Sequence, residues 1–163
     1  MLEHLRDLMG HQEWADAIFF HMWSKADATL EDEVLRRRTE HNVFVQEGFR
    51  KLILEEPLPG GLPSGLPPNY ADLKQRARAA TAALRRLLAA DLDEKSLAQV
   101  VRPPWAPDTP HALTVGDVLV QVAMHSQHHR GQNMTRLKEL GGAVVNVDWI
   151  IWLWQGKPEG RWD

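Results

Sequence analysis

A run of prolines and glycines at residues 57–68 constrains the fold of this chain more than any other feature of its sequence. The run, PLPGGLPSGLPP, contains five prolines and three glycines. Proline lacks a backbone N–H and clashes with the preceding helical turn, so a segment of this composition cannot continue a helix. Because the sequence on both sides has helical periodicity, the run predicts a long crossover loop between two helices.

Four segments carry apolar residues at steps of three and four, the period of an amphipathic helix. They cover about residues 2–25, 31–55, 70–90 and 114–140. Capping residues support three of the four starts. They are Thr29 with Asp32, Asn69, and Thr114 with Asp117. We therefore expect an all-α protein, an up-down-down-up four-helix bundle with one long crossover.

Two shorter segments interrupt or follow this pattern. Residues 97–102 and 111–113 are weakly alternating and separated by prolines, which predicts a short β-hairpin before the fourth helix. Three of the seven tryptophans lie within residues 147–154, which predicts a short C-terminal helix or an aromatic plug. We expect these tryptophans to fill the core or a dimer interface rather than to stack on a substrate.

Composition excludes several classes of protein. The 163 residues suit one domain with a sizeable core, expected over residues 1–163. No cysteine is present, which excludes disulfides, iron-sulfur clusters and a thiol nucleophile. The 22 acidic and 19 basic residues are interspersed, so we expect no nucleic-acid partner. Without an apolar run of signal-peptide or membrane-span length, we expect a soluble, cytoplasmic protein with no membrane partner.

Three of the eight histidines crowd into residues 125–129, inside the fourth predicted helix. His125 and His129 are four positions apart, a spacing that lets both imidazoles project from one helix face toward one ion. They continue a stripe that begins with Val118 and Val122, so they should point into the bundle. Imidazole is the commonest protein ligand for Zn, Ni, Cu and Fe, but two rarely hold a divalent ion alone.

The third ligand is expected to be His41, which shares an inward stripe of the second helix with Val34, Val45 and Leu52. A single core histidine is more often structural than a ligand. Burying an imidazole without a hydrogen-bond partner, however, costs roughly 1–3 kcal/mol, and one shared ion would satisfy all three. The sequence therefore predicts a metal site at His41, His125 and His129.

The other histidines are assigned elsewhere. His128 falls about 100° from His129 around the helix, so we place it at the rim of the site or behind the ligands. Solvated surface positions are expected for the remaining four, His4, His11, His21 and His111. A carboxylate-rich di-iron bundle is only weakly supported, because it needs Glu-x-x-His on two helices and no glutamate here has a histidine three residues later.

Polar neighbours of the pair have less specific roles. Arg130 is expected to form a surface or interhelical ion pair. The alternative, for both Arg130 and Gln132, is to orient a substrate or to bridge helices. Gly131 is expected to permit close approach of another helix. Glu40 and Glu47 lie on the helix of His41 but are expected to be solvated, so no catalytic residue or general base is assigned.

The motif His-x-x-x-His-Arg-Gly-Gln at residues 125–132 resembles the signature of the DinB/YfiT-like metalloenzymes. The flanking residues Gly116-Asp117-Val118-Leu119, Leu137 to Gly141 and Asp148 agree with it. Trp14-Ala15 stands where that family usually has Trp-Ala-Asn. The resemblance covers almost the whole chain in order of elements. It departs at Gln121, where many members carry a further histidine that is not one of the three ligands.

The resemblance implies a four-helix bundle, often a homodimer, with a divalent ion, commonly nickel or zinc, on one histidine of the second helix and two of the fourth. These map onto His41, His125 and His129. Members with assigned activity include thiol S-transferases that use bacillithiol-like cofactors and a mycothiol-dependent maleylpyruvate isomerase. The resemblance thus implies a small-molecule substrate and an external low-molecular-weight thiol as co-substrate.

Three hypotheses for the function stay open. Three histidine ligands leave a coordination position for water or substrate, which favours a metal-dependent enzyme, either a thiol S-transferase or a hydrolase. The alternative is a non-catalytic, metal-stabilised helical module for binding or stress response. A haem-binding or small-ligand-binding bundle would use the same inward histidines.

Overall fold

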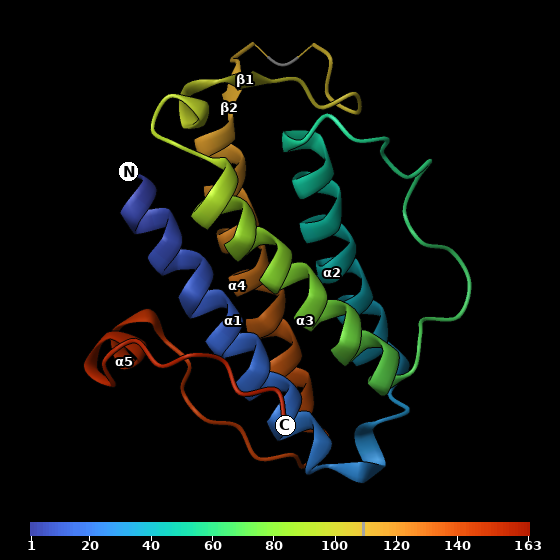
Figure 1. Cartoon of the computed structure of the whole chain (residues 1–163). Helices are drawn as coiled ribbons and strands as arrows, with labels where there is room; N and C mark the ends of the chain where they lie inside the picture. The colour runs from blue at the N-terminus through green and yellow to red at the C-terminus, as the bar shows by residue number, and fades with distance from the viewer. Residues whose placement is uncertain (109) are drawn as a thin grey trace.

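Four long helices form the body of the protein in the computed structural model, which describes residues 1–108 and 110–163 (Figure 1). They are α1 (Leu2–Ser24), α2 (Glu33–Ile53), α3 (Tyr70–Arg86) and α4 (Val115–Glu139). Figure 1 shows α1 and α4 running one way and α2 and α3 the other, which confirms the predicted all-α, up-down-down-up bundle. Within the described residues, no helix combines the length and the apolar character needed to cross a membrane.

Short polar side chains begin three of these helices. Asn69 accepts a hydrogen bond from the backbone of Asp72, and Thr114 and Asp117 form a reciprocal capping box. The second helix departs from prediction because Asp32, not Thr29, is its cap. Thr29 instead ends the 3-10 turn η1 (Asp27–Thr29), and its hydroxyl donates to the carbonyl of Ala26 at 2.7 Å. Helix α2 therefore begins two residues later than expected.

The connection between α2 and α3 has the irregular backbone that its prolines predict. It runs along one side of the bundle in Figure 1, from one end of α2 to the opposite end of α3. Gly65 has a φ of 104°, in the left-handed region that residues with a Cβ rarely adopt. A long crossover is what allows α2 and α3 to run in the same direction.

A small hairpin lies between α3 and α4, as predicted. Helix α3 is extended by a π-helical turn, η2 (Leu87–Asp91), and a 3-10 turn, η3 (Ser96–Ala98), leads into the hairpin. The strands β1 (Val100–Val101) and β2 (Leu113–Thr114) pair antiparallel, with Val100 opposite Thr114. Because β2 runs directly into α4, the hairpin fixes where that helix starts.

The core contains two large apolar clusters with a polar layer between them, and a third cluster under the C-terminal segment. Leu5 and Met9 of α1 pack in the large cluster near the hairpin, while Phe20 and Trp23 pack in the other large one. Between them, several of the buried residues on three helices are polar. They are Gln12 and Asp16 on α1, Thr39, Asn42 and Gln46 on α2, and Ser126, Arg130 and Asn133 on α4. The three clustered histidines lie at the level of this layer.

The C-terminal segment packs back onto α1, through the short helix α5 (Trp149–Trp154) that the sequence predicts. Trp152 is buried against Trp14 and Ala15 of α1, whereas Trp154 remains 75% exposed. The tryptophan-rich segment is thus partly a plug on the bundle, with one indole left in solvent.

His11 contradicts its predicted surface position. It is 5% exposed, and its Nε2 lies 2.8 Å from the carbonyl oxygen of Val147. The rings of Trp14, Trp149 and Trp152 surround it, and burial lowers its pKa. The C-terminal segment buries this face of α1. The other three histidines assigned to the surface, His4, His21 and His111, are exposed as predicted.

Candidate metal centre

Helices α2 and α4 bring three imidazoles together. His41 of α2 faces His125 and His129 of α4, with ring centroids 5.1 and 4.9 Å away, and the two α4 rings are 4.3 Å apart. One nitrogen of each ring lies within 4.8 Å of the others. The structure thus unites the three residues that the sequence singled out. That they bind a metal stays a prediction.

The chemistry of these nitrogens suits a metal ion. Burial, followed by the neighbouring histidines, lowers the pKa of His125 to about 4, and burial also lowers the pKa of His129. Both imidazoles are therefore neutral near pH 7, the form that donates a lone pair. Nδ1 of His125 is buried and has no hydrogen-bond partner among the described residues. A buried polar atom without a partner is unfavourable unless something else binds it.

Gln132 connects two of the α4 histidines. Its side-chain carbonyl lies 2.9 Å from Nδ1 of His129, and its amide nitrogen lies 3.0 Å from Nε2 of His128. With the carbonyl as acceptor, His129 carries its proton on Nδ1, so its Nε2 keeps a free lone pair. Gln132 therefore fixes the tautomer of one candidate ligand, a more specific role than the sequence indicated.

His128 lies at the rim, in agreement with its predicted place. It is exposed, and its ring centroid is 5.2 Å from that of His129. It is outside the group of three whose nitrogens come together. Its contacts are with His129 and with the amide of Gln132.

A buried ion pair supports the site from the side of α1. Arg130 is 3% exposed and binds Asp16 at 2.7 Å, so the predicted ion pair is interhelical and not on the surface. Burial raises the pKa of Asp16, while the adjacent Arg130 opposes the rise. Sequence reasoning missed Asp16 and its neighbour Gln12. The signal was two polar side chains four residues apart on the apolar face of the first helix.

The prediction for Gly131 is wrong. The residue is exposed, and a Cβ at this position would meet no atom within 4 Å. No helix approaches it closely, because it lies on the outer face of α4, one position beyond the inward-pointing Arg130.

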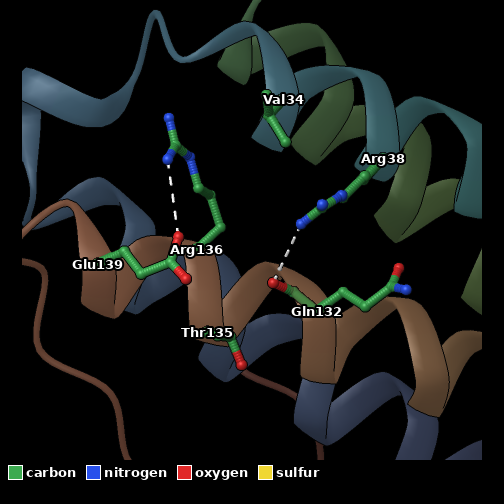
Figure 2. Close-up of a pocket in the computed structure, with 6 residues that line it drawn as sticks. All are labelled: Val34, Arg38, Gln132, Thr135, Arg136 and Glu139. Carbon is green, nitrogen blue, oxygen red and sulfur yellow. Dashed lines mark hydrogen bonds and ion pairs between the residues drawn. The ribbon is translucent and has the colours of Figure 1, made fainter.

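Two cavities lie near the histidines, and one of them is lined by His41 and His129. One, of about 270 Å³, is bounded on one side by the crossover loop. It is lined by Arg37, Arg38, Glu40, His41, Leu62, Pro63 and His129. The second, of about 430 Å³, lies between α2 and α4 (Figure 2). It is lined by Val34, Arg38, Gln132, Thr135, Arg136 and Glu139. His41 and His129 therefore face a space that a small molecule can enter, whereas no histidine lines the larger cavity.

Of the two glutamates considered on α2, Glu40 lines the first cavity, whereas Glu47 forms an ion pair with Arg76 of α3 at 2.8 Å. Both were expected to be solvated, and no local signal separates them. Their difference follows from which neighbouring helix each one faces.

Comparison with known proteins supports the resemblance seen in the motif. A family model described as the DinB superfamily matches residues 35–133, a range that contains all three clustered histidines. No curated protein and no solved structure gives a significant match.

Proposed function

Since this chain belongs to the DinB superfamily, we propose that it is a metal-dependent enzyme in which His41, His125 and His129 hold a divalent ion, nickel or zinc. We propose that it is either a thiol S-transferase or a hydrolase, and that its substrate is a small molecule. Three histidines with nitrogens within 4.8 Å of one another are the ligand set that this proposal requires.

The observation that carries the proposal is the position of these histidines beside a cavity. His41 and His129 line the space of about 270 Å³. Catalytic zinc sites commonly combine three protein ligands with an open position, whereas structural sites are closed by four. No cysteine is available to close this one. The arrangement thus favours a reactive site over a purely structural one.

When bound, such an ion would lower the pKa of a thiol or water and so supply a nucleophile near neutral pH. The chain's own residues have supporting tasks. Gln132 holds the Nδ1 proton of His129 and leaves Nε2 available. Leu62 and Pro63 of the crossover loop form one side of the cavity. Because the chain has no cysteine, the thiol must come from a second small molecule.

Two measurements test the proposal. Metal content, determined on protein produced without a histidine tag, should be about one nickel or zinc per chain. It should fall to background when His41, His125 and His129 are all replaced by alanine. The matched control is His21→Ala, which removes an exposed histidine of α1. An ion-free native protein, or equal binding by the triple variant, would overturn the metal assignment.

The second measurement separates an enzyme from a metal-stabilised module. The metal-loaded protein is incubated with a panel of thiols and electrophiles, and thiol consumption is followed. Metal-dependent turnover that the triple variant lacks supports the enzyme. A large rise in melting temperature with metal, without turnover of thiols or of hydrolysable esters, would support the non-catalytic alternative instead.

A further inference from the structure

One arginine lines both cavities beside the histidines. Arg38 lies on α2, one helical turn before His41, and forms part of the wall of each space. In Figure 2 its side chain extends from α2 across toward α4. Its charge is among the influences that lower the pKa of His129, after burial and nearby His41 and His128. The guanidinium is therefore close to the proposed ligands and faces the same space.

Arg38 differs from the other arginines at these cavities in having no ion pair. Arg37 binds Glu33 at 2.5 Å, and Arg136 binds Asp32 at 2.8 Å and Glu139 at 3.6 Å. Within the described residues, Arg38 makes no ion pair, and the hydrogen bond it donates, to the backbone oxygen of Gln132, is long at 3.4 Å (Figure 2). A guanidinium has five N–H donors, so most of its capacity is unused.

An unpaired, half-buried guanidinium at the wall of a cavity is suited to bind an anion. Its planar fork matches a carboxylate, with two parallel N–H···O hydrogen bonds. Glu40 lines the smaller cavity as well, but within the described residues no ion pair joins it to Arg38. A negatively charged ligand would give Arg38 the partner that the protein does not supply.

We propose that Arg38 binds a carboxylate or phosphate-like group of the substrate or of its thiol partner, while the reacting end of that molecule lies at the three histidines. The inference rests on the proposed function and makes it more specific. The site selects small anionic molecules, and Arg38 is the residue that determines this specificity.

The test compares thiols that share the reacting sulfur and differ at the far end. Zinc-loaded protein is titrated with mercaptoethanol, mercaptopropionate and mercaptoethylphosphonate, and each dissociation constant is measured by calorimetry. We expect the two anionic thiols to bind about tenfold more tightly than the neutral one, as a charge-assisted hydrogen-bonded pair would give. The ratio between carboxylate and phosphonate shows which anion the site prefers.

Variants identify the residue responsible. In Arg38→Gln the preference for the anionic thiols over mercaptoethanol should fall to within about twofold, because the charged partner is removed. Arg38→Lys keeps the charge but loses the fork, so part of the preference should remain. Arg37→Gln is the matched control and should keep the full preference, since Arg37 is already paired with Glu33. Glu40→Gln should increase the preference for anionic thiols.

Three outcomes would overturn the inference. The first is that the native protein binds anionic and neutral thiols equally well. The second is that both Arg38 variants keep the full preference for anionic thiols. The third is that Arg37→Gln loses as much of this preference as Arg38→Gln, which would indicate a diffuse positive field. Zinc content measured on the same samples separates this failure from that of the proposed function. Protein that binds zinc but lacks the preference refutes only the role of Arg38, whereas protein that binds neither zinc nor nickel refutes both.

Discussion

At the scale of single residues, the site depends on side chains that the helical spacing alone does not identify. The spacing of His125 and His129 is visible in the sequence, but the hydrogen bond that Nδ1 of His129 donates to the side-chain carbonyl of Gln132 is visible only in the structure. Partners of this kind orient a ligand and set its tautomer. The properties of the three imidazoles therefore depend on their neighbours as well as on their own positions.

Replacing Gln132 by leucine should weaken metal binding about 10- to 100-fold, the usual effect of losing a partner behind a metal ligand. The fold should persist, because Gln132 is only partly buried. Competition with a chromophoric chelator measures the affinity. Gln121→Leu, a change at an exposed position on the same helix, should leave it unaltered. Equal affinities for native protein and the Gln132 variant would refute this role.

The metal-free protein should lose stability as pH falls from about 6.5 to about 4. The pKa of His125 is lowered from 6.5 to about 4, so over this range the unfolded chain binds a proton that the folded chain does not. His129 and His11, whose pKa values are also lowered, act in the same direction. Urea unfolding in the presence of chelator, at several pH values, measures the effect. In His125→Leu the decline should be shallower, and a decline as steep as that of the native protein would contradict the account.

At the scale of elements, buried polar residues hold the helices in register around the site. Asp16 of α1 and Arg130 of α4 form a buried ion pair, and Gln46 of α2 donates to Ser126 of α4 at 3.2 Å. Each bond connects α4, which carries two candidate ligands, to another helix. The polar layer therefore does more than fill space, because it fixes α4 relative to α1 and α2.

Asp16→Ala should destabilise the protein by about 3–5 kcal/mol, because it leaves the charge of Arg130 buried and unpaired. The double variant Asp16→Leu with Arg130→Met should recover much of this loss, since an apolar pair no longer carries a buried charge. Urea denaturation gives both values. Breaking an exposed pair by Arg37→Ala should cost no more than about 1 kcal/mol. If Asp16→Ala also costs no more than about 1 kcal/mol, Arg130 has found another partner in that variant.

Local sequence signals predicted the elements well, because their causes are local. Prolines ended α2, and Asn69 and Thr114 began α3 and α4. The spacing of His125 and His129 likewise follows from helix geometry. His11 could not be placed this way, because Val147, which buries and bonds it, lies 136 residues away along the chain. The partner of Arg130 was missed for the same reason, since Asp16 is 114 residues distant.

At the scale of the whole molecule, the chain closes on itself through its C-terminal residues. After α5 the segment returns along the bundle, and Trp162 enters the core beside Phe20, with ring centroids 5.8 Å apart. Figure 1 shows this end lying over the same region as the end of α1. The segment covers one side of α1, while the cavities and histidines lie between α2 and α4.

Trp162→Ala should destabilise the protein by about 3–5 kcal/mol, the usual cost of removing a buried aromatic side chain. The residue is only 8% exposed, whereas Trp154 is 75% exposed. Trp154→Ala should therefore change stability by less than about 0.5 kcal/mol. Thermal and urea unfolding measure both variants. A loss of stability in Trp162→Ala as small as the one expected for Trp154→Ala would show that Trp162 is not part of the core.

The central claim is that His41, His125 and His129 together bind one divalent ion, and anomalous X-ray diffraction tests it most directly. Crystals of the native protein grown with zinc would be measured on both sides of the zinc absorption edge. The account predicts one dominant anomalous peak per chain, about 2.0–2.1 Å from a nitrogen of each of the three rings. A map with no peak at these rings, or with its main peak on other residues, would contradict it.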